Sequence, residues 1–398
     1  MSQQVWIAGG GVICGIGKNV EECLTSFENM QPGIEDMHYL QSAHKGVFPV
    51  AEVKSSNAEL AAATGLKPST SRTAMLSLLA VQEAWQSTGL GDIKQFRVGF
   101  ISANTVGGMD KTEDFYIDFL ANPQSGQLRH VVNHECGAAT EIVADAMGIK
   151  HHVSTISTAC SSGANALMLG SRLIKAGMLD AVIAGGTDSL TRFTVNGFNT
   201  LMILDQALCR PFDDTRTGLN LGEGAGYVVL VNDELATKLP GKPWCKLSGF
   251  ANANDAYHQT ASSPDGTGNY LAMKTALERS GIEPKDVAYI NLHGTGTANN
   301  DVSEGIAIER LFAGATPPAS STKSFTGHTL GASGGIEAVF SSLAVRDGII
   351  YPNARFQHQM KELSFSPVTT FSKGNDLPHV VSNSFGFGGN CSSLVFSR

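Results

Sequence analysis

The sequence predicts an α/β protein built from two similar halves. Its 398 residues exceed the usual limit for a single hydrophobic core, so two packed halves are expected. Charged residues make up 16%, hydrophobic residues 42%, and 44 residues are glycine, which is typical of a compact α/β chain with many tight turns. A pattern of β-branched run, turn and small-residue helix also occurs twice, at 153–167 and 320–337.

The N-terminal region begins with a predicted strand at Val5–Ala8, which enters a glycine-rich turn at 9–17. A dinucleotide-binding fingerprint would need glycine at position 14, where Cys14 stands, so NAD binding is not expected. Helices are predicted at Asn19–Met30 and Ser71–Thr88, with an irregular, polar surface segment at 31–66. The second helix carries an apolar stripe at helical spacing, which indicates a core face: Met75, Leu78, Leu79, Val81 and Trp85.

Short apolar runs indicate further buried strands at 98–103, 181–186 and 222–231. The segment 115–133 shows no clear period. His130 and His134 lie one helical turn apart but lack the glutamate of a zinc protease, so no metal site is expected.

The boundary between the halves is predicted at the Pro/Gly-rich linker 239–243, giving an N-terminal half at 1–240 and a C-terminal half at 241–398. The second half repeats the design of the first. A strand at 288–292 leads into His293-Gly-Thr-Gly-Thr297, and a helix is expected at 301–312. The segment 320–337 then forms a small-residue helix, which suits a position between layers.

Cys160 lies where the β-branched run at 153–157 gives way to small helix formers. A thiol at a helix start is expected to have a lowered pKa, because the unpaired N–H groups there stabilise the thiolate. The alternative is a buried cysteine that acts as a small hydrophobe. The flanking serines and glycine, together with two distant histidine motifs, favour a nucleophile.

Composition excludes several classes of protein. A net charge of −8 gives no general attraction for nucleic acid or an anionic membrane, and no 18-residue apolar segment occurs. Seven scattered cysteines without a CxxC pair indicate neither a disulfide framework nor a zinc site. With no signal-peptide pattern at the N-terminus, the sequence predicts a soluble protein of the reducing cytoplasm.

The motifs occur in a characteristic order: Cys160, His293-Gly-Thr-Gly-Thr297, Lys323-Ser-Phe-Thr-Gly-His328 and Asn383-Ser-Phe-Gly-Phe-Gly-Gly389. This order resembles the elongating β-ketoacyl-(acyl carrier protein) synthases of the thiolase superfamily, over essentially the whole chain. The resemblance implies a five-layer α/β/α/β/α fold and a decarboxylative Claisen condensation. It also implies an acyl carrier protein as partner, a homodimer or a pseudo-twofold heterodimer, and neither metal nor cofactor, since the phosphopantetheine arrives on the carrier.

The same resemblance assigns roles to individual residues. Cys160 would take the acyl chain, with the backbone N–H groups of Cys160 and Phe387 as the oxyanion hole. His293 and His328 would stabilise the enolate formed when a malonyl thioester loses carbon dioxide. Lys323 and Glu337 would support His328. Thr295 and Thr297 would bind the pantetheine with their hydroxyls. Phe387 would act as the gate, and Phe198 and Val106 would form walls of the acyl pocket.

Two departures from the family pattern concern the substrate. The motif GFGGTN is altered to Gly386-Phe-Gly-Gly-Asn390-Cys391, which places a second thiol near the site, although its context does not favour a catalytic base. The arginine that fatty-acid enzymes carry after the Phe198 position is replaced by Leu201-Met202-Ile203. Three basic residues remain as candidate carrier contacts: Lys67, Arg72 and Arg129.

These departures leave alternatives to fatty-acid synthesis open. The main alternative is a ketosynthase for a polyketide or aryl polyene, with a chain-length-factor partner. A non-condensing chain-length subunit is disfavoured because such subunits usually lack the nucleophile that Cys160 supplies. A thiolase is disfavoured by the second histidine.

Overall fold

The computed structural model describes residues 3–398 as two groups of five strands joined edge to edge. The first half contains five strands, eight α-helices and two short 3₁₀ turns among these residues: β1 Trp6–Cys14, α1 Val20–Glu28, α2 Asn57–Thr64, α3 Arg72–Thr88, η1 Ile93–Gln95, β2 Val98–Ala103, α4 Met109–Ala121, η2 Leu128–His130, α5 Cys136–Met147, β3 His152–Ile156, α6 Ser162–Lys175, β4 Ala181–Asp188, α7 Arg192–Thr200, β5 Gly224–Val231 and α8 Asp233–Ala236.

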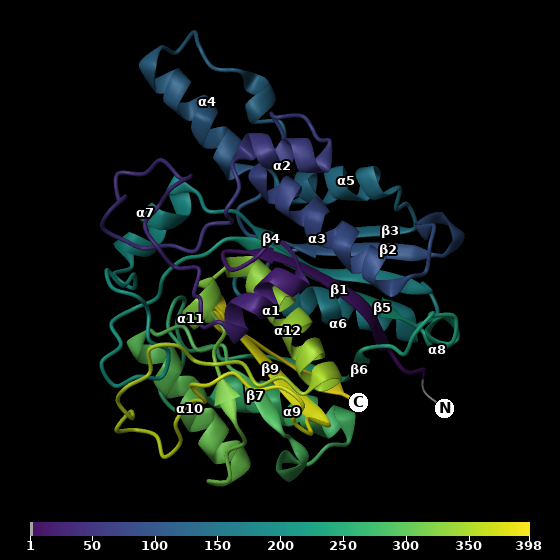
Figure 1. Cartoon of the computed structure of the whole chain (residues 1–398). Coiled ribbons are helices and arrows are strands. Elements are labelled where there is room, and N and C mark those ends of the chain that lie inside the picture. Colours follow the sequence, from purple (N-terminus) through teal and green to yellow (C-terminus); the bar gives the residue numbers. More distant parts are fainter. Residues whose placement is uncertain (1–2) are drawn as a thin grey trace.

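The second half continues in the same style (Figure 1): β6 Cys245–Asn254, α9 Thr267–Ser280, η3 Pro284–Asp286, β7 Tyr289–Asn291, α10 Ala298–Phe312, β8 Ala319–Ser320, α11 Lys323–Thr326, η4 Leu330–Ala332, α12 Ser333–Asp347, β9 His379–Gly386, η5 Phe387–Gly389 and β10 Asn390–Ser397. None of the helices within residues 3–398 is long and apolar enough to cross a membrane.

Strand order shows that the two halves repeat one topology. The first group runs β3-β2-β4-β5-β1 and the second, read from its far edge, runs β8-β7-β9-β10-β6. In each group the first three strands are parallel and the last two pair antiparallel. Among residues 3–398, two residue pairs between β1 and β6 join the two strand groups. The predicted pair of similar halves is confirmed, while the boundary at residue 240 stays a prediction.

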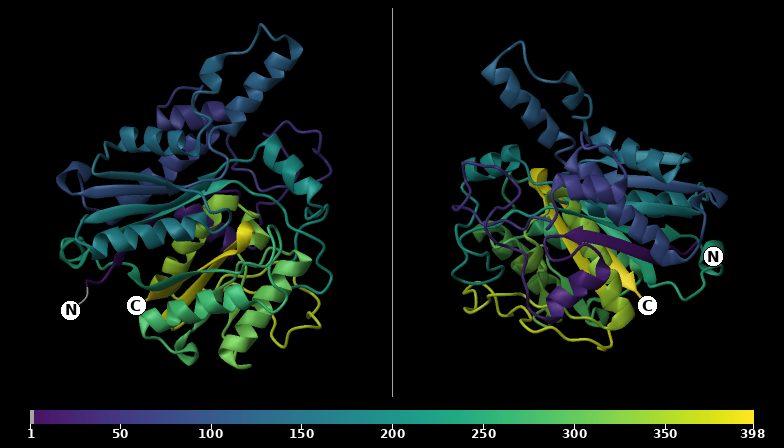
Figure 2. Two further views of the ribbon diagram at one scale, coloured as in Figure 1. Left: turned by 180° about the vertical axis from the view of Figure 1, so that it is seen from behind. Right: turned by 45° about the horizontal axis from the view of Figure 1, so that its top comes forward.

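The helices complete five layers, as predicted. α3 covers one face of the first strand group, and α9 covers the outer face of the second. Between the groups lie α6 and α12, which contact strands of both halves and each other (Figure 2). Their small residues allow this approach, because a Cβ added at Gly163 would lie 2.5 Å from the backbone nitrogen of Gly335. Residues 333–345 of α12 are all buried, so the prediction of a small-residue helix between layers is confirmed.

Two predictions for the N-terminal region were wrong. The strand β1 continues through Gly9–Cys14, where a turn was expected. Its glycines serve close packing, since a Cβ at Gly11 would lie 2.2 Å from the carbonyl oxygen of Ala80 in α3. The segment 31–66, predicted to be irregular and on the surface, is irregular up to residue 56 but then forms α2, and side chains such as Met37 and Val53 are buried. The buried side chains of this segment do not recur at a helical or strand period, so no periodic pattern reveals them in the sequence.

Candidate active site

Cys160 lies in the turn between β3 and α6, at the centre of the molecule. The preceding residue, Ala159, has φ +52°, a left-handed conformation uncommon for a residue with a side chain. This turn reverses the chain, so that α6 begins at Ser162 with Cys160 just before its N-terminus. The equivalent turn of the second half, between β8 and α12, carries His328. The repeated topology therefore brings the two turns face to face.

Three groups surround the Cys160 thiol. Its Sγ lies 3.1 Å from Nε2 of His328, and the backbone N–H groups of Phe387 and Cys160 itself point toward the sulfur. Burial raises the pKa of Cys160 to about 11, although Lys323 and these N–H groups oppose the rise. The expectation of a lowered pKa was wrong in sign, because desolvation outweighs the helix N-terminus. The resting group is a neutral thiol.

Hydrogen bonds define which nitrogen of His328 carries the proton. Its Nδ1 accepts from the backbone N–H of Leu330 at 3.2 Å and lies 3.1 Å from Oγ of Ser333. A neutral imidazole with an accepting Nδ1 carries its proton on Nε2. Burial, and then the charge of Lys323, hold the pKa of His328 well below its usual value. The ring is therefore a neutral donor aimed at the sulfur.

His293 stands beside His328, with ring centroids 5.4 Å apart and planes at 87°. Its loop is fixed by Glu304, whose carboxylate accepts the backbone N–H groups of His293 and Gly294 at 2.8 Å each. Burial lowers the pKa of His293 well below its usual value, with further contributions from Lys323 and His328. Both imidazoles are thus held neutral by their surroundings.

Lys323 and Glu337 form a buried ion pair behind the histidines. The ammonium of Lys323, at the start of α11, donates to Oε1 of Glu337 on α12. Burial raises the pKa of Glu337 to about 7 against the attraction of Lys323. Lys323 does not line the cavity, so it acts on the site through its charge. The supporting role predicted for both residues stays a prediction.

A cavity leads from the surface to Cys160. Its lining includes every predicted site residue except Val106, Lys323 and Glu337. Thr295 and Thr297 face it with their hydroxyls 3.0 Å apart, and the ring of Phe387 stacks on Phe198 at 5.9 Å between centroids. Val106 is buried instead in an apolar cluster next to Phe198.

The structure adds three buried carboxylates that the sequence analysis did not identify. Asp301 accepts the backbone N–H groups of Thr295 and Gly296, and Glu304 accepts that of His293. Asp188 accepts the backbone N–H groups of Thr105 and Gly331, and burial raises its pKa to about 6. Asp301 and Glu304 lie at i and i+3 in the helix that follows the HGTGT motif, a spacing visible in the sequence.

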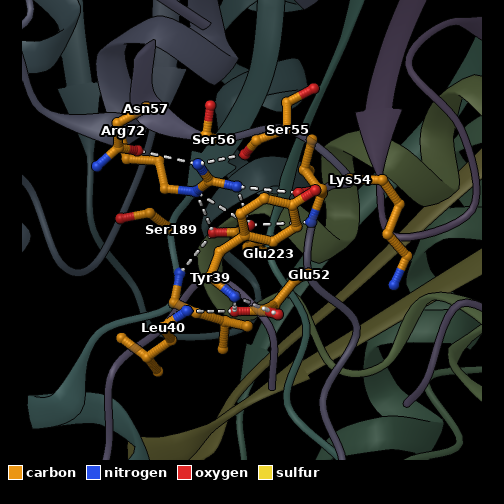
Figure 3. Close-up of polar contacts among 12 residues, drawn as sticks. Tyr39, Leu40, Glu52, Lys54, Ser55, Ser56, Asn57, Arg72, Ser189 and Glu223 are labelled. Carbon is orange, nitrogen blue, oxygen red and sulfur yellow. Dashed lines mark hydrogen bonds and ion pairs between the residues drawn. The ribbon is translucent and has the colours of Figure 1, made fainter. Parts of the chain in front are cut away.

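Arg72 and Cys391 also bear on the sequence predictions, as a candidate carrier contact and a second thiol near the site. Arg72, a candidate carrier contact, is buried and bound to Glu223 (Figure 3), whereas Lys67 and Arg129 are exposed. Cys391 lines the cavity, but its thiol donates to Oδ1 of Asn269 at 3.1 Å, and burial raises its pKa to about 12. A thiol held in this way is poorly suited to act as a base.

Comparison with known proteins agrees with this geometry. Residues 2–236 match the model "Beta-ketoacyl synthase, N-terminal domain", and residues 244–357 match "Beta-ketoacyl synthase, C-terminal domain". The chain belongs to the β-ketoacyl synthase family. It is therefore an acyl-transferring, condensing enzyme, as the sequence predicted.

Individual relatives agree over the full length. The chain is 32% identical to 3-oxoacyl-[acyl-carrier-protein] synthase 2 of Staphylococcus aureus, covering 100% of this chain and 99% of that protein. Among solved structures, a chain of the complex between the ketosynthase ApeO and its chain length factor ApeC from Xenorhabdus doucetiae matches at 32% identity with a TM-score of 0.85, over 99% of this chain and 98% of that chain. The ishigamide ketosynthase/chain length factor shares the fold, with a TM-score of 0.92 at 24% identity over both chains in full.

Proposed function

We propose that the protein is a β-ketoacyl-(acyl carrier protein) synthase that elongates an acyl chain held on Cys160. The observation that carries this proposal is a thiol that meets His328 and two backbone N–H groups in one cavity, with the second imidazole, His293, beside His328. A thioester exchange needs the thiol and the N–H groups, and a decarboxylation needs donors that stabilise an enolate.

In the first half-reaction, the sulfur of Cys160 attacks the carbonyl of an acyl thioester on the carrier. The new C–S bond forms as the bond to the pantetheine sulfur breaks, and the proton of the Cys160 thiol ends on the released pantetheine thiol. The N–H groups of Cys160 and Phe387 stabilise the tetrahedral oxyanion. The exchange converts one neutral thiol and one neutral thioester into another such pair, so it does not require a stable thiolate at Cys160. A raised pKa of Cys160 is therefore compatible with this step.

In the second half-reaction, a malonyl thioester binds and loses carbon dioxide. The electron pair of the broken C–C bond forms an enolate, whose oxygen accepts from Nε2–H of His328 and from His293. The enolate carbon then attacks the acyl group, and the Cys160 thiolate leaves and takes up a proton. Burial is the main reason that both rings stay neutral, as donors rather than imidazolium ions, and the charge of Lys323 adds to this effect.

The cavity suits the long substrate arm. Thr295 and Thr297 offer hydroxyls to the pantetheine near its mouth, and Phe387 sits beside Cys160 as a gate between glycines. Phe387 stacks on Phe198, which packs against the apolar cluster that holds Val106. Movement of Phe387 would open a path toward this cluster for the acyl chain. The mechanism that we propose uses no metal and no bound cofactor, since the phosphopantetheine belongs to the carrier.

We further propose a homodimer. On its outer side, β3 has no partner strand among residues 3–398, and Val153 on it is 38% exposed. Apart from β3, the arm formed by α4 and the following loop stands away from the body in Figures 1 and 2 and exposes large apolar side chains: Tyr116, Ile117, Leu120, Leu128 and Val132. A second copy would pair β3 with β3 and cover these side chains.

All seven cysteines are free thiols, which suits a cytoplasmic location.

The alternative is a ketosynthase of a type II polyketide or aryl-polyene pathway, working with a chain-length factor. The identity to a chain of the ApeO–ApeC complex, 32%, equals that to the Staphylococcus aureus synthase, so the comparisons favour neither pathway. A heterodimer would use the same edge of β3.

Intact-protein mass spectrometry tests the proposal. The purified chain is incubated with acyl-carrier thioesters of several lengths, followed by malonyl-carrier. We expect an acyl adduct that maps to Cys160 and then leaves as an extended β-ketoacyl-carrier, with no adduct on Cys160→Ala. Extension by the chain alone supports a self-sufficient synthase. Extension only after a chain-length factor is added supports the alternative, and condensation by Cys160→Ala would refute the assigned nucleophile.

A further inference from the structure

Apolar side chains stand exposed at the mouth of the active-site cavity. Met202, just after α7, lines the cavity and is 88% exposed. Its neighbour Leu201 is 40% exposed. Tyr257, next to the cavity-lining His258, is 57% exposed. We call Leu201, Met202 and Tyr257 the apolar lip.

The backbone holds Met202 in this outward position. Its φ is +55°, a left-handed conformation that few residues other than glycine adopt. Its N–H donates to the carbonyl of Asn199 at 2.9 Å, and the next residue, Ile203, accepts from the N–H of Leu219 at 2.9 Å. A left-handed residue is a common way to end a helix, and at the end of α7 it turns the methionine side chain toward solvent.

The lip carries little charge. Within the described part of the chain, no lysine or arginine lines the cavity. Between residues 201 and 208 the only charged residue is Asp205, which is buried and accepts from Oγ1 of Thr217 at 2.8 Å. Arg216 turns inward and donates to the carbonyls of Thr297 and Ala298. Ionic attraction therefore has no cationic group at the lip to act through.

We propose that the apolar lip is the docking surface for the carrier protein, and that this enzyme binds its carrier there by apolar contact in place of ion pairs. This inference rests on the proposed function. The occupant follows from geometry, because a thioester tethered to a carrier can reach Cys160 only if the carrier body rests at the cavity mouth. The flexible thioether of Met202 suits such a contact, since methionine adapts its shape to a partner.

Steady-state loading kinetics test the lip. The substrate is a hexanoyl-carrier, chosen from a set of bacterial acyl carrier proteins as the one with the highest kcat/KM, and hexanoyl-pantetheine is the carrier-free comparison. We expect Met202→Gln to raise KM for the carrier about tenfold with kcat retained, the effect of losing one buried methionine contact. KM for hexanoyl-pantetheine should change far less.

Charge and shape variants separate the apolar contact from an ionic one. Met202→Lys should also raise KM at low salt, and Met202→Leu should stay close to the parent. Met178→Gln, the same change at a remote exposed site, is the matched control. A lower KM for Met202→Lys at low salt, or an unchanged KM for Met202→Gln, would overturn the inference. Failure of the parent chain to accept an acyl group of any length, from a carrier or from pantetheine, would instead refute the proposed function.

Discussion

Two buried ion pairs of the same chemical kind are built very differently. Arg72 donates to both carboxylate oxygens of Glu223, and its remaining N–H groups reach the carbonyls of Val53 and Ser55 and the side chain of Asn57 (Figure 3). Glu223 in turn accepts the backbone N–H groups of Val53 and Leu190. Burial alone would lower the pKa of Arg72, but Glu223 raises it above its usual value.

The pair behind the active site is much less saturated. Lys323 donates to Oε1 of Glu337, while Oε2 of Glu337 has no hydrogen-bond partner in the described part of the chain. Burial correspondingly raises the pKa of Glu337 to about 7. A fully bonded pair fixes structure, whereas a sparsely bonded pair leaves its positive charge to act on its neighbours. The neighbours of Lys323 are Cys160, His293 and His328, whose pKa values it lowers or holds down.

The largest effect on stability is expected from breaking the saturated pair. Arg72→Ala leaves the carboxylate of Glu223 buried without its counter-charge. We expect the free energy of unfolding to fall by about 3–5 kcal/mol, measured by urea denaturation. The kcat per folded molecule should be unchanged, since Arg72 lies outside the active-site cavity.

A double variant shows whether the cost is that of an unpaired charge. Arg72→Met combined with Glu223→Leu removes both charges and should recover most of the loss. Arg97→Ala breaks an exposed ion pair with Asp180 and should cost much less. A double variant as unstable as Arg72→Ala would show that packing of Arg72, and not charge pairing, is the main contribution.

Removing the charge of Lys323 should act mainly on catalysis. Lys323→Met keeps the length of the side chain but lets the pKa values of Cys160 and both histidines rise. We expect kcat to fall about 100-fold or more, comparable to the loss of one electrostatic stabiliser of a transition state. Stability should fall less than in Arg72→Ala, because Glu337 can take up a proton. Lys274→Met is an exposed control, and a kcat within threefold of the parent would refute the role of Lys323.

Sequence analysis predicted the catalytic residues that lie in short contiguous motifs. It missed the features that depend on residues far apart in the chain. Cys160, His293 and His328 each lie in a contiguous motif, so their residue types and flanking glycines indicated both chemistry and order. The role of Arg72 depends on Glu223, which lies 151 residues away, and a buried arginine cannot be told from an exposed one without that partner. The prediction of a lowered pKa for Cys160 was wrong for a related reason, since the desolvation that raises this pKa depends on packing from both halves.

Fold-level predictions succeeded where a pattern repeated. Two strand–turn–helix patterns predicted two halves and a shared middle, because each small-residue helix needs a close neighbour. The glycine-rich stretch at 9–17 has no second copy in the sequence, so no repeated pattern indicated its structure. Glycine serves turns and close strand–helix packing alike, and only the position of α3 shows that packing applies here.

The pH dependence of stability should reveal the sparsely bonded pair. Burial raises the pKa of Glu337 to about 7, from roughly 4.3 in an unfolded chain. Between these values the folded protein keeps a proton that the unfolded chain has released, so this contribution is full below about pH 4.5 and is lost as pH rises through 7. Glu337→Gln cannot titrate. The stability of the parent relative to Glu337→Gln should therefore decline from pH 5 to pH 7.

Urea denaturation of both proteins at pH 5, 6 and 7 measures this difference. Other buried carboxyl groups with raised pKa values, such as Glu304 and Asp188, are common to both proteins, so their contributions cancel. A relative stability that stayed level or rose with pH would mean that Glu337 is ionised throughout this range. Lys323 would then be fully paired, like Arg72, and the difference between the two ion pairs would lie in hydrogen-bond number alone.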